Sequence, residues 1–211
     1  MDRILQKRVM PVLVLDDLSS AVPLAEALLR AGQDVIEITF RTAAAPEAVK
    51  AIRTKFPNML VGAGTLLTPE QVQQAVSAGA MFGVSPGLNE RVVTKANALK
   101  FPMVPGVMTP SEIEKAIELG CRLLKFFPAE QAGGVRTLQA YWGPYSHTGI
   151  KFITLGGITQ DTMSNYLALP SVAAVGGSWM VDKKLIAGKE WDKIEALSRD
   201  ALRIAAAVKK S

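Results

Sequence analysis

A lysine inside an apolar segment is the first residue whose surroundings suggest chemistry. Lys125 interrupts the run Leu-Leu-Lys-Phe-Phe at residues 123–127. If this run is a strand, alternation puts Lys125 on the same face as Leu123 and Phe127. Burial disfavours the ammonium form of lysine, and the neutral amine attacks carbonyl carbon. Lys125 is therefore a candidate nucleophile, and pairing with an interior carboxylate such as Glu37 is compatible with that role.

A second candidate group lies in the segment 35–42. Glu37, Thr39 and Arg41 alternate with apolar residues, so these three side chains share one face of a strand. The apolar face must meet neighbouring helices, which turns the polar face towards a barrel interior. A buried carboxylate and guanidinium are costly unless they are paired or take part in function. The alternative to a functional role is a buried salt bridge.

Two glycine pairs predict a phosphate site. Gly156-Gly157 follows the seventh apolar run, and Gly176-Gly177-Ser178 follows the eighth. In barrels of alternating strands and helices, the loops at these places and the start of a short extra helix bind phosphate through backbone N–H groups. Glycine lets the backbone approach the anion closely.

Three smaller features end other predicted strands. The hydroxyl of Thr65 follows the third, Ser85-Pro86-Gly87 ends the fourth, and Pro105-Gly106-Val107 ends the fifth. Each is also explained by turn formation, and for Pro105-Gly106 a turn is the interpretation that we adopt.

The elements that position these residues alternate regularly along the chain. Eight short apolar runs recur at intervals of roughly 21–28 residues, the length of one strand–helix unit. They are Met10–Val14, Val35–Phe40, Leu60–Gly64, Met81–Ser85, Met103–Pro105, Leu123–Phe127, Lys151–Leu155 and Val172–Gly176. Eight units predict one closed (β/α)8 barrel (TIM barrel) as a single domain over 1–211. The alternative is an open doubly wound sheet.

Helix signals separate the runs. Segments 68–79 and 109–120 each begin with threonine and proline and end at glycine. Leu18–Ala31 and Trp191–Lys210 are also predicted helices, and Arg3–Lys7 is predicted as a short lead-in helix. A barrel of this kind has its active site at the carboxyl ends of its strands, where the candidate residues lie.

Composition limits the possible functions. The net charge of +5 comes from scattered basic residues such as Lys183 and Lys184, so we expect a solvated surface and no nucleic acid as partner. With one cysteine, Cys121, and one histidine, His147, the chain offers no internal disulfide and no metal site built from several such residues. His147 is expected in a surface loop. The sequence shows no signal peptide or membrane span, which predicts a soluble, cytoplasmic protein.

Six blocks in order resemble the 2-keto-3-deoxy-6-phosphogluconate (KDPG) and 4-hydroxy-2-oxoglutarate (KHG) aldolases over nearly the whole chain. The blocks are Glu-Ile-Thr-Phe-Arg-Thr (37–42), Gly-Ala-Gly-Thr (62–65), Ser-Pro-Gly (85–87), Lys-Phe-Phe-Pro-Ala-Glu (125–130), Gly-Gly-Ile (156–158) and Gly-Gly-Ser-Trp (176–179). The resemblance implies a class I aldolase without cofactor or metal, typically trimeric. Its products would be pyruvate and either glyceraldehyde 3-phosphate or glyoxylate.

The resemblance also implies roles for residues. Lys125 would form the Schiff base, and Glu37 would be the general acid and base. The pyruvyl carboxylate would be held by Arg41, Thr65 and Pro86, and Phe127 would pack on the bound keto acid. The distal phosphate would be bound by Gly156, Gly157, Gly177 and Ser178.

One residue departs from the family pattern. Members specific for the gluconate-derived substrate usually have threonine before the first glycine pair, whereas this chain has Leu155. Leucine cannot form a hydrogen bond to the C4 hydroxyl, which weakens the prediction of strict C4 selectivity. Two other functions stay open: a non-covalent isomerase or synthase that uses Glu37 and Lys125 as acid and base, and a non-catalytic sugar-phosphate binder.

Overall fold

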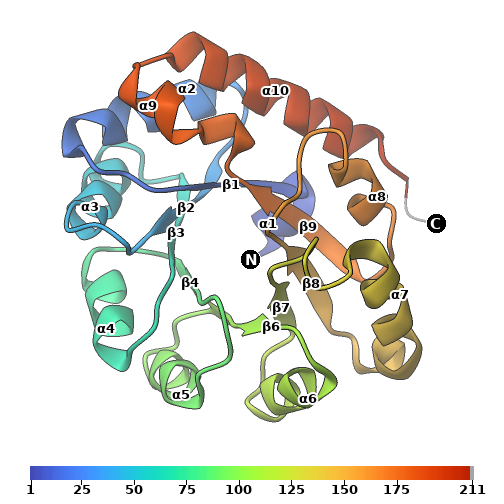
Figure 1. Cartoon of the computed structure of the whole chain (residues 1–211). Coiled ribbons are helices and arrows are strands. Elements are labelled where there is room, and N and C mark those ends of the chain that lie inside the picture. Colours follow the sequence, from blue (N-terminus) through green and yellow to red (C-terminus); the bar gives the residue numbers. More distant parts are fainter. Residues whose placement is uncertain (210–211) are drawn as a thin grey trace.

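A ring of parallel strands forms the centre of the computed structural model, which describes residues 1–209 (Figure 1). In this part of the chain the strands are β1 (Val9–Leu13), β2 (Val35–Thr39), β3 (Leu60–Gly64), β4 (Phe82–Val84), β5 (Met103–Val104), β6 (Gly106–Val107), β7 (Leu123–Phe126), β8 (Lys151–Thr154) and β9 (Val172–Gly177). Their order is β5-β4-β3-β2-β1-β9-β8-β7-β6. Because β5 and β6 are joined by Pro105 alone, the two edges meet. The barrel prediction is confirmed, and the open sheet is excluded.

The fifth predicted strand differs from the structure in one respect. We interpreted Pro105-Gly106 as a turn, but Gly106–Val107 forms β6 and pairs with β7. Pro105 has no N–H to donate to the ladder, so it separates β5 from β6. Its carbonyl still accepts a hydrogen bond of 2.8 Å from the N–H of Lys125. The predicted turn is therefore wrong, and the chain stays extended past the proline.

Helices surround the barrel (Figure 1). They are α1 (Asp2–Lys7), α2 (Ala21–Arg30), α3 (Ala45–Lys55), α4 (Pro69–Ser77), α5 (Glu90–Ala98), α6 (Pro110–Glu118), α7 (Gly134–Tyr145), α8 (Met163–Leu167), α9 (Lys183–Ala187) and α10 (Trp191–Ala207). Short 3-10 turns are η1 (Leu18–Ser20), η2 (Ser146–Thr148) and η3 (Trp179–Val181). No helix in residues 1–209 is long and apolar enough to cross a membrane.

The predicted helix starts follow from capping side chains. Thr68 caps α4 by accepting the N–H of Gln71. Thr109 and Glu112 form a reciprocal capping box at α6. Two helices depart from prediction: the segment predicted from Leu18 starts as η1, and α10 ends at Ala207. The predicted end of α10, Lys210, lies outside the described residues.

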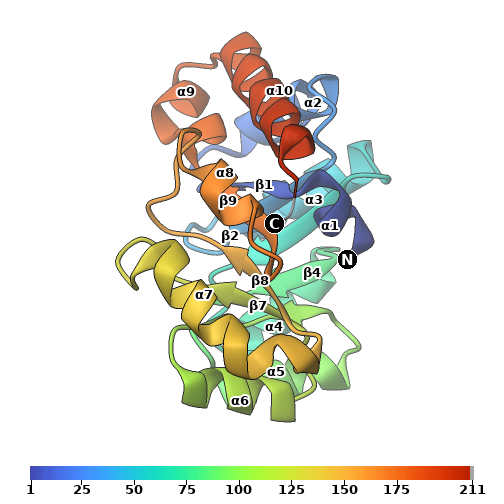
Figure 2. The ribbon, with the colours of Figure 1, turned by 90° about the vertical axis from the view of Figure 1, so that its right-hand side faces the viewer.

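Two apolar layers hold the barrel together. The outer layer fills the space between strands and helices, and its larger members include Leu28, Ile52, Phe126 and Tyr166. The inner layer fills the barrel and includes Ile4 of α1, which is fully buried. Figure 2 shows α1 at one end of the barrel and α9 with the α8 loop towards the other. The end opposite α1 is the one that carries the candidate residues.

Candidate active site

A cavity of about 400 Å³ opens at the carboxyl ends of the strands. All ten residues predicted to act on or bind substrate line it: Glu37, Arg41, Thr65, Pro86, Lys125, Phe127, Gly156, Gly157, Gly177 and Ser178. Other lining residues are Val12, Leu13, Val14, Thr39, Leu155, Ile158, Gly176, Val181, Asp182 and Lys183. Residues up to 141 positions apart along the chain, from Glu37 to Ser178, are thus brought into one site.

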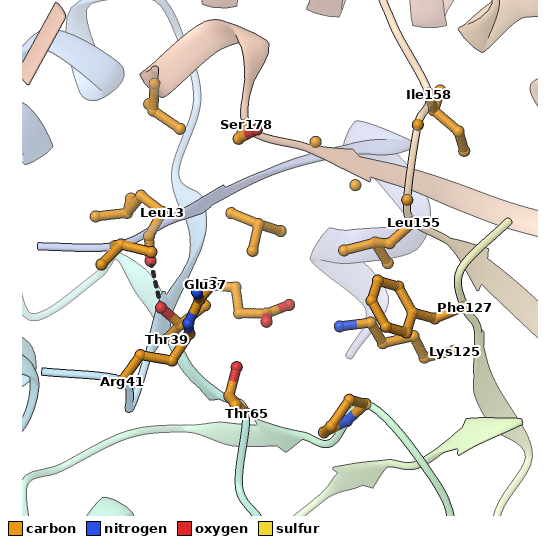
Figure 3. A pocket seen from close by; sticks show the side chains of 18 of the residues that line it. Leu13, Glu37, Thr39, Arg41, Thr65, Lys125, Phe127, Leu155, Ile158 and Ser178 are labelled. Carbon is orange, nitrogen blue, oxygen red and sulfur yellow. Dashed lines mark hydrogen bonds between the residues drawn. The ribbon is translucent and has the colours of Figure 1, made fainter. Parts of the chain in front are cut away.

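Lys125 lies on β7 with its side chain directed into this cavity (Figure 3). The residue is only 6% exposed. Its Nζ lies 4.9 Å from the centroid of the Phe127 ring. Figure 3 shows the amine pointing towards the carboxyl group of Glu37 on the opposite side of the cavity. The alternation that was predicted from sequence is confirmed, because Lys125 and Phe127 share the interior face.

Glu37 is completely buried on β2. Burial raises the pKa of its carboxyl group, and the positive charge of Lys125 opposes this only in part. Among residues 1–209, neither carboxyl oxygen has a hydrogen-bond partner. The buried salt bridge with Arg41 and the static hydrogen-bonded pair with Lys125 are therefore both absent. An unpaired polar group in a buried site is costly and is explained best by a ligand that completes it.

Gly64 leaves the space that the carboxyl group of Glu37 occupies. A Cβ atom on Gly64 would lie 2.0 Å from Oε1 of Glu37. The register of the sheet causes this closeness, since Glu37 pairs with Gly62 and the next interior position on β3 is Gly64. The sequence contains this glycine in the block 62–65, but only the strand register reveals what it does.

Arg41, Thr65 and Pro86 gather on the side of the cavity formed by β2, β3 and β4. Thr65 has a φ of 58°, a left-handed conformation that is unusual for threonine and common at functional sites. Pro86 is close to β6, because a Cβ on Gly106 would lie 2.1 Å from the carbonyl oxygen of Pro86. Gly106 thus lets the loop after β4 reach the cavity rim.

The glycine loops form the upper rim in Figure 3, where Ser178 and Ile158 are labelled. Gly156 and Gly157 have φ values of 100° and 79°, a conformation that L side chains rarely adopt. Gly177 ends β9, and Ser178 leads into η3, so a short helix begins where it was predicted. Residues of both loops line the same cavity.

Leu155, the residue directly after β8, faces the cavity (Figure 3). The preceding residue, Thr154, is fully buried, and its hydroxyl group has no hydrogen-bond partner. By alternation it points away from the cavity. Leu155 therefore lines the site, and Thr154 does not.

Lys183 and Asp182 are lining residues that sequence reasoning missed. We assigned Lys183 to the scattered surface charges, because nothing in the periodicity distinguishes it from Lys184. His147 lies exposed in η2 and does not line the cavity, as expected. Within residues 1–209, no group of three or more histidine, cysteine or acidic side chains is arranged to hold a metal ion.

Comparisons with a family model and with known proteins identify relatives of this chain. The family model described as KDPG and KHG aldolase matches residues 1–197. The 2-dehydro-3-deoxy-phosphogluconate aldolase of Haemophilus influenzae is 43% identical over 203 residues, which cover 96% of this chain and 95% of that protein.

Two solved structures are similar over almost their full length. One is a KDPG aldolase from Legionella pneumophila with pyruvate captured as a covalent carbinolamine (TM-score 0.88, 40% identity, covering 91% of this chain and 92% of that one). The other is the KDPG aldolase of Zymomonas mobilis with 3-phosphoglycerate (TM-score 0.88, 38% identity, covering 100% and 96%).

Proposed function

The chain belongs to the KDPG and KHG aldolase family, and from this premise we propose that it cleaves KDPG, or its C4 epimer, to pyruvate and glyceraldehyde 3-phosphate. Cleavage of KHG to pyruvate and glyoxylate belongs to the same proposal. The protein is a class I aldolase, a carbon–carbon lyase that works through a Schiff base. The observation that carries the residue assignments is a buried lysine facing a buried, unpartnered carboxyl group.

Lys125 is the proposed nucleophile. Its neutral amine adds to the C2 carbonyl of the substrate, and loss of water from the carbinolamine gives a protonated imine. When the C3–C4 bond breaks, its electron pair moves into this imine and forms an enamine, while C4 leaves as an aldehyde. Protonation of the enamine at C3 and hydrolysis of the imine release pyruvate and restore the amine.

Glu37 is the proposed proton carrier. The mechanism needs a group that accepts the proton of the C4 hydroxyl and later donates one to C3. Burial raises the pKa of Glu37, which makes its carboxylate a stronger base than an exposed glutamate and suits a group that must take up a proton. The absence of other hydrogen-bond partners leaves its oxygens available to substrate.

The remaining assignments divide the cavity between the two ends of the substrate. Arg41, Thr65 and Pro86 would hold the pyruvyl carboxylate, and Phe127 would pack on the keto acid beside Lys125. Gly156, Gly157, Gly177 and Ser178 would bind the distal phosphate through backbone N–H groups. The 3-phosphoglycerate in the Zymomonas mobilis relative supports a phosphorylated substrate.

Leu155 affects the expected selectivity of the enzyme for the configuration at C4 of the substrate. An apolar side chain there gives no hydrogen bond by which to favour one configuration of the C4 hydroxyl. We expect cleavage of both C4 epimers of the phosphorylated sugar acid, with kcat/KM values within about one order of magnitude. Steady-state rates with each epimer and with KHG would identify the preferred substrate.

We also propose a homotrimer that acts in the cytoplasm. The trimer rests on the family resemblance and on exposed apolar side chains, such as Leu67 and Met108, at loops near the cavity rim. The cytoplasm rests on the family to which the chain belongs. Sedimentation equilibrium should give about three times the mass of one chain, and a monomer at micromolar concentration would contradict the trimer.

Trapping with borohydride tests the function directly. Reduction in the presence of pyruvate should attach a pyruvyl group irreversibly to Lys125, as detected by peptide mass spectrometry. Lys151, on the neighbouring strand β8, is the internal control and should stay unmodified. Lys125→Ala should abolish turnover and trapping. Full cleavage activity without any adduct would exclude the Schiff base and favour non-covalent use of Glu37 and Lys125 as acid and base, and neither adduct nor activity would favour the sugar-phosphate binder.

A variant of the acid–base residue completes this test. Glu37→Gln should lower kcat by about 10²–10⁴, because the proton transfers lose their carrier. Slow pyruvate trapping should persist, since the amine of Lys125 remains. Glu90→Gln, at an exposed carboxylate on α5, is the matched control and should keep the wild-type rate. A Glu37→Gln variant as fast as wild type would show that the proton-transfer assignment is wrong.

A further inference from the structure

Lys183 is a cation at the cavity rim to which the proposed mechanism gives no role. It begins α9 and lines the cavity together with Gly177 and Ser178. Among the described residues, the cationic side chains that line this cavity belong to Arg41, Lys125 and Lys183. The proposed function uses Lys125 for the imine and Arg41 for the pyruvyl carboxylate. Only Lys183 is left to balance a negative charge at the distal end of the substrate.

A second, smaller cavity of about 260 Å³ adjoins this rim. Val14 and Lys183 line both cavities, whereas Asp16 lines only the smaller one. The Oδ2 of Asp16 lies 2.6 Å from the Nζ of Lys183. Asp16 therefore draws the ammonium group of Lys183 towards the smaller cavity and away from the substrate.

The ion pair between Asp16 and Lys183 is easily exchanged. The side chains are 54% and 69% exposed, so water screens their attraction, and such pairs add little to stability. A phosphate carries more charge than a carboxylate and offers more acceptor oxygens, and charge-assisted hydrogen bonds to it are strong. A phosphate at the glycine loops is thus a better partner for this ammonium than Asp16 is.

We propose that Lys183 exchanges Asp16 for the distal phosphate of the substrate and so sets the preference for phosphorylated over unphosphorylated substrates. Asp16 acts in this scheme as a competing anion that holds the ammonium group until phosphate arrives. The inference rests on the proposed function for the identity of the substrate, but phosphate binding by itself tests it.

Titration of the full chain with inorganic phosphate, followed by ³¹P NMR, is the primary experiment. Lys183→Gln should raise the Kd for phosphate about tenfold, as expected for the loss of one charge-assisted contact. Lys184→Gln is the matched control, because it removes the same charge from the adjacent residue, which does not line the cavity. Its Kd should stay within about twofold of wild type. Equal phosphate affinity in Lys183→Gln and wild type would overturn the proposal.

The role of Asp16 gives a prediction of opposite sign. Asp16→Asn removes the competing anion, so phosphate should bind about threefold more tightly than to wild type. In the Lys183→Gln background the same change should have no effect, because no ammonium group is left to release. If Asp16 instead positioned Lys183 for phosphate, Asp16→Asn would weaken binding, and that result would exclude the competition.

Turnover separates a failure of this inference from a failure of the proposed function. Lys183→Gln should lower the ratio of kcat/KM for KDPG to kcat/KM for its unphosphorylated counterpart about tenfold, and Lys184→Gln should not. If wild type cleaved neither sugar acid, the proposed function would fail while the phosphate titration still decided the role of Lys183. If wild type preferred the phosphorylated substrate and Lys183→Gln preferred it equally, the role of Lys183 alone would fail.

Discussion

At the scale of single residues, the cavity contains two ionisable groups that face each other without a hydrogen bond between them. Glu37 is completely buried, and both of its oxygens lack partners. Lys125 is 6% exposed and lies against the Phe127 ring. Packing and strand register fix both side chains before any substrate is present, so the protein does not have to break an internal ion pair to react. The cost of the unpaired carboxyl group falls on the stability of the free protein.

This cost has a definite pH dependence. Burial raises the pKa of Glu37 in the folded protein, so the folded state binds this proton more tightly than the unfolded chain does. The contribution of Glu37 to the free energy of unfolding is therefore full below its unfolded pKa of about 4.3 and is lost as pH rises through the folded pKa. Glu37→Gln has no such loss.

The expected result is that Glu37→Gln gains thermal stability relative to wild type as pH rises from about 4 to 8. The measurement is Tm by differential scanning calorimetry at both pH values, with Glu90→Gln as the control. A difference in Tm between Glu37→Gln and wild type that stays constant over this range would show that Glu37 does not titrate as proposed.

Gly64 provides a second prediction at this scale. Gly64→Ala would place a Cβ atom 2.0 Å from Oε1 of Glu37, so the carboxyl group must move. We expect kcat to fall about 10- to 100-fold, since a small displacement of a proton carrier is costly. Gly87→Ala on the neighbouring rim loop is the control, because no heavy atom lies within 4 Å of a Cβ there. Wild-type kcat in a folded Gly64→Ala variant would contradict the assignment.

At the scale of elements, the loop after β4 reaches the cavity only because β6 lacks a side chain at its first residue. Gly106→Ala would bring a Cβ atom to 2.1 Å from the carbonyl oxygen of Pro86 and so push that loop outward. If Pro86 helps to hold the pyruvyl carboxylate, half-saturation by pyruvate in the trapping reaction should rise about tenfold. Gly87→Ala, on the other side of the same contact, should leave it unchanged. An unaltered half-saturation in Gly106→Ala would remove Pro86 from the carboxylate site.

The sequence was sufficient for the order of the elements and for the direction of the principal side chains. Eight apolar runs at a regular spacing predicted the barrel, and alternation within them turned Lys125 and Glu37 inward. The continuation of the chain as β6 was missed, because proline and glycine together are typical of turns and local propensity does not include the pairing with β7.

Features that depend on contacts between distant segments were not predictable in this way. The space that Gly64 leaves for Glu37 depends on the register of β2 with β3. The position of Lys183 depends on how the chain turns after β9, and its exposed side chain carries no burial signal. Alternation along one strand predicts the direction in which a side chain points. The distances between side chains on opposite sides of the cavity follow only from the closed barrel.

At the scale of the whole molecule, the barrel has one end filled and one end open. Ile4 of α1 is fully buried in the inner apolar layer at the end opposite the cavity. Ile4→Ala should lower the free energy of unfolding by about 2–5 kcal/mol, the usual cost of such a cavity. Leu5→Ala, one residue further and 44% exposed, is the control and should change it by less than about 0.5 kcal/mol.

Urea unfolding followed by circular dichroism measures both variants. Because Ile4 lies at the end of the barrel opposite the cavity, the folded fraction of Ile4→Ala should trap pyruvate at the wild-type rate. Equal stability of the two variants would mean that α1 does not contribute to the inner layer.

The attachment of α1 and β1 also bears on the order in which the protein can fold during synthesis. Ile4 packs in a layer that includes Ile153 and Ala174, and β1 pairs with β9. The guanidinium of Arg8 donates to the carbonyl groups of Leu167, Ala205 and Val208. A nascent chain that stops before Val172 has neither the strand that closes the ring nor two of the three acceptors for Arg8. The ring therefore cannot close around the facing lysine and glutamate until β9 has been synthesised.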